Sequence, residues 1–184
     1  MKLKMEKGLN YIFNQDTQVI IMGTFPSIKS RGVCYYNHPQ NQFWKIIAEI
    51  CHDKDIIEGT PDIRYACLLK NGIGLWDVIQ SCEFEKESSL DSKIIKGSII
   101  YNDFSLLQKE CPNLKCIVFS SKYACKLYKS YLKTKSTVRI IDWLNDLTNN
   151  GKNILPSTSP ANARKKPEEK LKEWKSFLTK YINE

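Results

Sequence analysis

Residues 19–44 read VIIMGTFPSIKSRGVCYYNHPQNQFW, and this stretch decides the fold of the chain. It opens with the apolar run 19–22, which stops at Gly23 and a loop that contains Pro26. A β-branched run that ends at a Gly/Pro loop predicts a buried strand whose loop lies at the edge of a sheet. Ligands of open α/β sheets bind outside the carboxyl ends of the strands. The aromatic and amide side chains of this loop therefore suit a flat polar ligand, although the same aromatics would also suit a hydrophobic core.

The rest of the chain alternates apolar runs with helical patterns. Helices are predicted at residues 41–51, 60–71 and 167–181, from 102 or 103 to 110, and from 120 or 121 to 132, where Ser120 or Ser121 is the expected cap. Strands are predicted at 73–79, 114–119 and 153–155, with a further short strand at 138–141. Residues 1–16 are polar and are expected to lead into the first strand, and residues 82–98 are expected to be mostly loop. Strands that alternate with helices predict a parallel sheet covered on both faces. Without a repeat or a linker, one domain over residues 1–184 is expected.

Composition places the chain among soluble proteins with reduced thiols. No apolar run reaches the ~20 residues that span a bilayer, and the N-terminus lacks the apolar segment of a secretory signal. The seven cysteines are odd in number and form no C-x-x-C pair, which predicts free thiols in a cytoplasmic protein. The nearest pair, Cys111 and Cys116, does not make a metal site, and His38 and His52 do not complete one. No metal is therefore expected.

The chain is basic, with 28 Lys and Arg against 20 acids and a net charge of +8, which predicts polyanionic partners. Residues 115–139 hold seven basic side chains and no acid, but those at helical spacing would also fit a solvated helix surface. A second cluster, Arg164, Lys165 and Lys166, follows the hydroxyl side chains of residues 157–159. This set suits phosphate contacts, although it would also fit an ordinary helix entry. Because two carboxyl-end loops of a parallel sheet converge, we expect a base pocket with phosphates held at its rim.

Three ordered motifs resemble the uracil-DNA glycosylase superfamily, namely GTFPS at residues 23–27, YYNHPQNQFW at 35–44 and LPSTSPANA at 155–163. The resemblance is strongest to the hypoxanthine-DNA (deoxyinosine) glycosylase branch, and more distant to the mismatch-specific uracil/thymine glycosylases. Residues 73–78, followed by Ser89, Leu90 and Asp91, also look like that branch. The resemblance spans nearly the whole chain. It implies an α/β fold of three layers, α/β/α, around a mostly parallel four-stranded sheet.

The resemblance also implies roles for single residues. The catalytic residue would be Asn41, in the motif H-P-x-N-x-F-W, because Phe25 occupies the position of the catalytic Asn of mismatch-specific relatives. Asn41 would also serve as a cap for the helix at Phe43, and His38 also has a structural interpretation. The base pocket would be formed by Gly23, Thr24, Phe25, Pro26, Tyr36 and His38, with Tyr36 and Phe25 stacking on the base. DNA would be contacted by Ser27, Ser157, Thr158, Ser159, Pro160, Asn162, Arg164 and Lys165.

Two features depart from the pattern of the relatives. The third strand runs from Phe119 into Ser120, Ser121 and Lys122, where relatives often have a Phe-Asn-Gly-like turn. Residues 143–150 look inserted. Both features concern the rim of the site rather than its chemistry.

The activity implied is that of a monofunctional DNA glycosylase of base-excision repair, which flips a deaminated base out of the duplex and hydrolyses its N-glycosidic bond. No motif places a lysine as an imine-forming nucleophile, and neither a metal nor an organic cofactor is needed. Hypoxanthine and uracil share a carbonyl group next to a ring N–H, so both are expected substrates. The expected partner is double-stranded DNA, and also single-stranded DNA, with no membrane contact. We expect a cytoplasmic monomer that acts at the nucleoid.

Two other functions remain open at this stage. A hydrolase or transferase acting on free nucleosides or nucleotides would need a phosphate loop such as G-x-x-x-x-G-K-[ST] or G-x-G-x-x-G, and neither motif is present. A non-catalytic nucleic-acid-binding module would be favoured if the pocket were collapsed or Asn41 were buried away from it.

Overall fold

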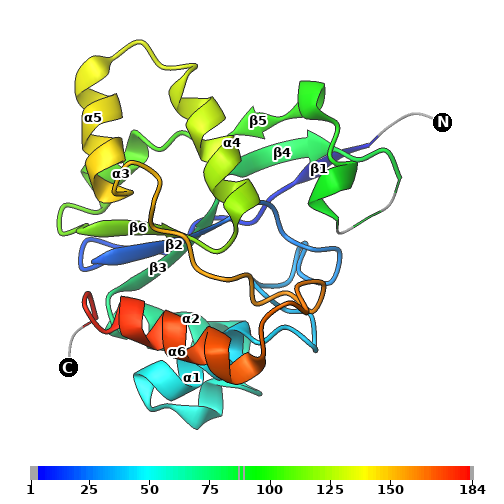
Figure 1. The fold of residues 1–184 in the computed structure, drawn as a ribbon, viewed down its shortest axis with the longest axis vertical. Helices are drawn as coiled ribbons and strands as arrows, with labels where there is room; N and C mark the ends of the chain where they lie inside the picture. Colours follow the sequence, from blue (N-terminus) through cyan, green and yellow to red (C-terminus); the bar gives the residue numbers. More distant parts are fainter. Residues whose placement is uncertain (1–3, 87, 89, 183–184) are drawn as a thin grey trace.

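The computed structural model describes residues 4–86, 88 and 90–182 and is built around a parallel sheet (Figure 1). The sheet has the order β3-β2-β6, with β2 (Val19–Gly23) between β3 (Ile73–Asp77) and β6 (Cys116–Phe119). Every residue of β2 is buried, as expected for the central strand of a parallel sheet covered on both faces. The register pairs Gly23 with Asp77 and Met22 with Phe119, so the carboxyl ends of the three strands meet at one edge.

Helices cover both faces of this sheet (Figure 1). One face packs against α1 (Phe43–Cys51), α2 (Pro61–Lys70) and α6 (Pro167–Leu178). The other face packs against α3 (Leu106–Glu110), α4 (Lys122–Leu132) and α5 (Val138–Leu147). Val19 and Ile21 enter the first core and Ile20 and Met22 the second, because strand side chains alternate between faces. A 3-10 helix, η1 (Lys54–Ile56), follows α1. The prediction of a parallel α/β sheet covered by helices is confirmed.

A second, antiparallel sheet of order β1-β4-β5 extends the first and was not predicted. It contains β1 (Met5–Lys7), β4 (Ile79–Glu83) and β5 (Ile100–Tyr101). A single residue, Val78, separates the end of β3 from the start of β4, so the predicted strand at 73–79 is divided between the two sheets. β1 lies within the polar residues 1–16, and the expected loop at 82–98 contains the end of β4 with two 3-10 helices, η2 (Asp91–Lys93) and η3 (Lys96–Ser98).

One strand prediction is wrong, and a second is reduced to a single bridge. Residues 138–141 begin α5, because their apolar residues continue at helical spacing into Leu144 and Leu147, which are both buried. Residues 143–150, which look inserted in the sequence, complete α5 and the turn after it. The parallel sheet has three strands rather than four, because the predicted strand at 153–155 makes only an isolated parallel bridge between Ile154 and Phe119.

The seven cysteines are free thiols, and all except Cys51 are buried. Burial raises the pKa of the Cys82 thiol to about 11, so this sulfur packs as a small apolar group rather than acting as a nucleophile. Within the described residues, no helix is long and apolar enough to cross a membrane.

Candidate active site

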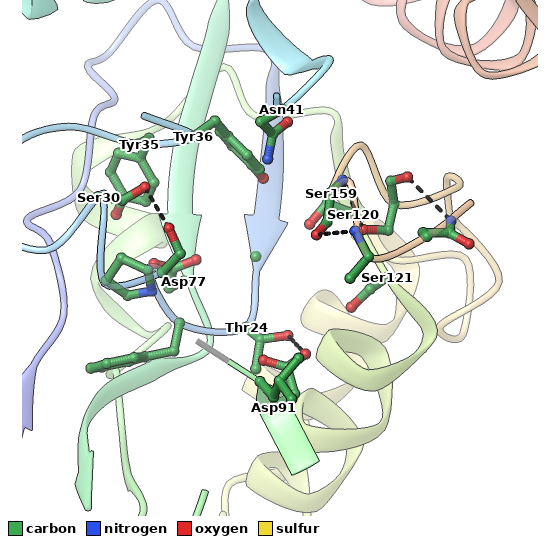
Figure 2. Close-up of a pocket in the computed structure, with 18 of the residues that line it drawn as sticks. Thr24, Ser30, Tyr35, Tyr36, Asn41, Asp77, Asp91, Ser120, Ser121 and Ser159 are labelled. Carbon is green, nitrogen blue, oxygen red and sulfur yellow. Dashed lines mark hydrogen bonds between the residues drawn. The ribbon is translucent and has the colours of Figure 1, made fainter. Parts of the chain in front are cut away.

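A cavity of about 550 Å³ opens at the carboxyl edge of the parallel sheet (Figure 2). Its wall combines the loop after β2, the end of β3, η2, the residues after β6 and the loop before α6. Its size lies in the range of small-ligand sites. The two loops that were expected to converge both contribute to it. Of the predicted site residues, the cavity is lined by Gly23, Thr24, Phe25, Pro26, Ser27, Tyr36, Asn41, Ser157, Ser159, Asn162 and Arg164.

Hydrogen bonds hold the loop after β2 in shape. Ser30 Oγ lies 3.1 Å from Ser27 Oγ, and these two hydroxyls close a tight turn. The Arg31 guanidinium donates to the Pro26 carbonyl at 3.2 Å and to the Ser88 carbonyl at 2.9 Å. Arg31 therefore joins this loop to the segment that leads into η2, and both segments line the cavity.

Asn41 lies where the loop becomes α1. Its Oδ1 accepts the Phe43 N–H at 2.9 Å, so the expected capping contact is present, although the cap position itself falls on Gln42. The Asn41 backbone N–H donates to the His38 carbonyl at 2.8 Å, which fixes the turn before it. Figure 2 shows the Nδ2 group directed into the cavity, where it donates no hydrogen bond to any of the described residues. Asn41 thus offers the cavity two N–H donors from a fixed side chain.

Tyr36 forms one side of the cavity. Its ring stacks on Phe43, with ring centres 3.8 Å apart and planes 14° apart, so Phe43 covers one face of it. The Tyr36 backbone has φ 55°, which is uncommon for a tyrosine and shows that the loop imposes its conformation. Burial raises the pKa of the Tyr36 hydroxyl, with partial compensation by a hydrogen bond to Ser120. A base stacked on Tyr36 would have to use the face of the ring opposite Phe43.

The cavity lining does not include His38, Thr158, Pro160 or Lys165. His38 Nδ1 accepts the Gln40 N–H at 3.2 Å, which favours the structural interpretation of this histidine. Thr158 is 1% exposed, and its carbonyl accepts the Gln42 N–H at 3.1 Å. Lys165 is exposed and forms an ion pair with Glu173 on α6. Pro160 is exposed on the loop before α6.

α6 holds this loop in place. Trp174 Nε1 donates to the Pro156 carbonyl at 2.9 Å, and Lys170 Nζ donates to the Asn162 carbonyl at 2.8 Å. Trp174 is fully buried, and Lys170 is 4% exposed. Burial lowers the pKa of the Lys170 amine. Because α6 packs on the sheet, these two bonds fix the loop at 156–163 relative to the cavity.

Asp77, which was not predicted as a site residue, lies on the cavity wall at the end of β3. Its carboxyl is buried, and its Oδ2 has no hydrogen-bond partner among the described residues. Burial, and to a smaller extent the Asp91 carboxylate, raises the pKa of Asp77 to about 8. Asp77 is the polar end of β3 and lies at the same edge as Gly23, but this place in the site follows only once the end of the strand is known.

Asp91 of η2 is a second carboxyl on the wall. Thr24 Oγ1 donates to Asp91 Oδ2 at 3.2 Å (Figure 2). Burial raises the pKa of Asp91 to about 6, and the Thr24 hydrogen bond partly opposes this shift. Ser120 and Ser121, which follow β6, also line the cavity, although the sequence marks them only as a departure from the turn of the relatives and not as site residues. They could have been found by the argument used for the loop after β2, since β6 ends at the same edge.

Comparison with known proteins identifies the family. The family model described as the uracil DNA glycosylase superfamily matches residues 11–183. The chain belongs to the uracil DNA glycosylase superfamily. A hypoxanthine DNA glycosylase from Methanosarcina acetivorans is 32% identical over 165 residues, which cover 87% of this chain and 90% of the relative. A hypoxanthine DNA glycosylase from Methanosarcina barkeri is 33% identical over 118 residues, which cover 64% of this chain and 72% of the relative.

A solved structure agrees with membership of the uracil DNA glycosylase superfamily. The solution NMR structure of a candidate uracil DNA glycosylase from Methanosarcina acetivorans matches with a TM-score of 0.69 and 29% identity, over 95% of this chain and 97% of that chain. The chain is thus a DNA glycosylase of this superfamily, a hydrolase of N-glycosyl bonds. The sequence-based predictions of family, reaction class and DNA substrate are confirmed at this level.

Proposed function

We propose that this glycosylase excises deaminated bases, hypoxanthine or uracil, and that it acts as a monofunctional, single-domain monomer without a metal or cofactor. The observation that carries the proposal is the cavity at the sheet edge, where Asn41 and Tyr36 face the same space and the exposed Arg164 lies on the rim. The Methanosarcina relatives named hypoxanthine DNA glycosylase support hypoxanthine as one of the bases.

The residues of the cavity supply the contacts that excision requires. Extruding a base from the duplex costs roughly a few kcal/mol, and stacking it on an aromatic ring returns ~1–3 kcal/mol. Tyr36 and Phe25 line the cavity and are suited to this contact. Cleavage leaves an oxocarbenium-like sugar and negative charge on the base, which N–H donors aimed at the base stabilise. Asn41 Nδ2 is such a donor, and the backbone N–H groups of residues 23–25 are further candidates.

Residues at the rim of the cavity are placed to contact the DNA backbone. Ser27, Ser157, Ser159, Asn162 and Arg164 line the cavity on the side of its loops, and hydroxyl, amide and guanidinium groups are common partners of phosphate oxygens. Among the described residues that line the cavity, the basic side chain is an arginine, which does not form an imine with the sugar. This supports a monofunctional mechanism.

A non-catalytic binding module would be favoured by a collapsed pocket or by an Asn41 side chain turned away from it. Neither condition is met, because the cavity holds about 550 Å³ and Asn41 lies in its lining. The same geometry favours catalysis over mere binding.

The proposal is tested with end-labelled duplexes that carry a single deoxyinosine or deoxyuridine, beside a matched duplex with a normal base. We expect strand breaks that appear only after alkali, since a monofunctional enzyme leaves an intact abasic site. Breaks that form without alkali would overturn the monofunctional assignment. A wild-type enzyme inactive on both modified duplexes would overturn the proposal as a whole.

Two substitutions at Asn41 separate catalysis from capping. Asn41→Ala removes both the Nδ2 donor and the contact with the Phe43 N–H, so we expect loss of excision and a stability loss of about 1 kcal/mol. Asn41→Asp keeps the capping oxygen and removes the donor, so we expect wild-type stability with excision as low as in Asn41→Ala. Single-turnover rates and thermal melts measure both effects. Wild-type rates in Asn41→Asp would show that the Nδ2 donor is not needed.

A further inference from the structure

Asp77 is a buried carboxyl that the protein itself does not satisfy. Its Oδ2 lacks a hydrogen-bond partner among the described residues, although the side chain is 4% exposed. A buried polar group without a partner costs ~1–3 kcal/mol, so such groups in native proteins require an explanation. Because Asp77 lines the cavity, a ligand within the cavity is the natural partner once the side chain turns this shielded oxygen toward that space.

The backbone that carries this carboxyl is tightly held. The Asp77 carbonyl accepts from Asn102 Nδ2 at 2.8 Å, and the next residue, Val78, donates its N–H to the Gly23 carbonyl at 2.9 Å. A Cβ atom added at Gly23 would lie 2.2 Å from Asp77 Oδ1, so the carboxyl occupies space that only a glycine leaves open. In the view of Figure 2, Asp77 lies on the same side of the pocket as Ser30 and Tyr35.

We propose that the Asp77 carboxyl hydrogen-bonds directly to the extruded base and selects bases with a carbonyl group beside a ring N–H. This inference rests on the proposed function and adds the group that recognises the base. A protonated carboxyl has one O–H donor and one carbonyl acceptor side by side. It can donate to the base carbonyl and accept from the ring N–H at once, whereas an ionised carboxylate would repel the carbonyl oxygen.

Burial, and then the charge of Asp91, favours the protonated form of Asp77 at neutral pH. The charged side chains of the cavity lining are Asp77 itself, Asp91 of η2 and Arg164 of the loop before α6. The negative charge of Asp91 adds to burial in holding the Asp77 proton. The Tyr35 and Tyr36 hydroxyls also interact with Asp77, and burial keeps both of them neutral. With pKa values of about 8 for Asp77 and about 6 for Asp91, Asp77 is mostly protonated and Asp91 mostly ionised at pH 7.

This contact also contributes to catalysis. When the N-glycosidic bond breaks, its electron pair stays on the base, and negative charge reaches the carbonyl oxygen that Asp77 contacts. A donor already in place stabilises this charge without giving up its proton. Once Asp77 is ionised, the donor is lost and the carboxylate opposes the developing charge.

The pH dependence of excision tests the inference, because Asp77→Asn keeps an N–H donor and a carbonyl acceptor but does not titrate. Single-turnover rates of the wild type on the deoxyinosine duplex should fall about tenfold between pH 7 and pH 9, as one titration near pH 8 implies. Asp77→Asn should retain excision at pH 7 and lose this alkaline fall. Ionisation of the base itself affects both enzymes equally. The ratio of the Asp77→Asn rate to the wild-type rate therefore reports on Asp77 alone, and it should rise about tenfold between pH 7 and pH 9.

The inference would be overturned if Asp77→Asn kept the alkaline fall, or if it folded but had no activity at pH 7. In both cases an active wild type would leave the proposed function standing. A wild type inactive at every pH would instead overturn the proposed function. If Asp77→Asn does not fold, Asp91→Asn takes its place. Removal of the Asp91 charge lowers the pKa of Asp77, so the alkaline fall should move to lower pH. An unmoved fall would count against Asp77.

Discussion

At the scale of single residues, Gly23 decides whether the Asp77 carboxyl fits beside the loop after β2. The two residues are paired in the register of the parallel sheet, and both backbones are held by ladder hydrogen bonds. The steric conflict caused by a larger residue 23 must therefore be relieved by the Asp77 side chain. Glycine at this position serves close approach rather than an unusual backbone angle, since Gly23 is absent from the residues with positive φ.

Gly23→Ala should therefore impair excision more than it impairs folding. The added methyl would lie 2.2 Å from Asp77 Oδ1, and we expect at least a tenfold loss (about 1.4 kcal/mol) in the single-turnover rate as the carboxyl is displaced. Gly97→Ala is the matched control, because an added Cβ at Gly97 meets no atom within 4 Å. Equal rates for the two variants would show that the position of the Asp77 carboxyl does not matter.

Asp77 also shows why the site could be predicted only in part. In the sequence it interrupts an apolar run, GLWDVI, which predicts one strand at 73–79 with Asp77 in its interior. The structure divides this run between two sheets, and Asp77 is the residue at which the first strand ends. Asn41, Tyr36 and Arg164 could be predicted because they lie in loops that follow a recognisable pattern. A polar residue within a strand is recognised as part of a site only when the end of the strand is known.

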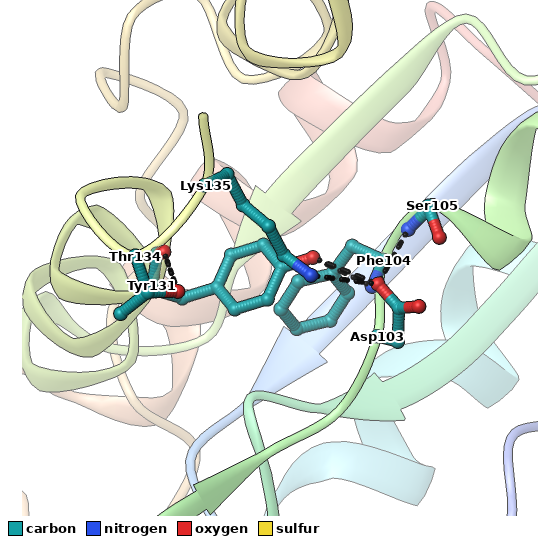
Figure 3. Close-up of polar contacts among 6 residues, drawn as sticks. All are labelled: Asp103, Phe104, Ser105, Tyr131, Thr134 and Lys135. Carbon is teal, nitrogen blue, oxygen red and sulfur yellow. Dashed lines mark hydrogen bonds and ion pairs between the residues drawn. The ribbon is translucent and has the colours of Figure 1, made fainter. Parts of the chain in front are cut away.

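At the scale of elements, α4 is held at both of its ends. Ser121 Oγ, at the cavity, accepts the Ala124 N–H at 3.0 Å, as the sequence predicted for one of the two serines. At the other end, the Tyr131 hydroxyl donates to Asp103 Oδ1 at 3.1 Å, and Lys135 Nζ donates to the same oxygen at 3.1 Å (Figure 3). Burial acts to raise the pKa of Asp103, but these hydrogen bonds and those from Ser105 outweigh it and lower the pKa.

The elements that were predicted correctly have strong local signals. α2 starts at Pro61 after the capping residue Thr60, and α6 starts at Pro167. The short strands of the antiparallel sheet have no such signal, because β1 and β5 contain three and two residues and depend on pairing with β4. At 138–141, the β-branched residues favour a strand in the sequence. The segment is helical because a helix buries Leu144 and Leu147 further along α5.

The contact between α6 and its preceding loop can be tested at Lys170. Lys170→Met keeps the buried stem and removes the bond to the Asn162 carbonyl, which is worth about 1 kcal/mol. The loop must then be ordered when DNA binds, so we expect KM to rise about fivefold with little change in kcat. Lys172→Met, on an exposed position of the same helix, is the control. Steady-state kinetics with identical KM values for both variants would contradict this role for Lys170.

At the scale of the whole molecule, the cavity and its surroundings differ in charge. The chain carries a net charge of +8, yet the cavity wall holds two carboxyls and one arginine. Positive charge thus attracts the DNA backbone, while the cavity itself suits a neutral base better than a phosphate. The convergence of the loops was predictable from the parallel topology. The acidic wall was not, because it depends on the register of β2 against β3 and on the placement of η2.

Two neighbouring basic residues separate rim contacts from the general basic surface. Arg164 lines the cavity, whereas Lys165 forms an ion pair with Glu173. If Arg164 neutralises one phosphate, Arg164→Gln should weaken binding to the modified duplex and reduce the slope of log K against log[salt] by about 1. Lys165→Gln should change the slope by clearly less, because its charge is already partly balanced by Glu173. Fluorescence anisotropy between low and moderate salt measures both slopes. Equal reductions for the two variants would show that Arg164 at the cavity rim contacts DNA no more closely than Lys165 does.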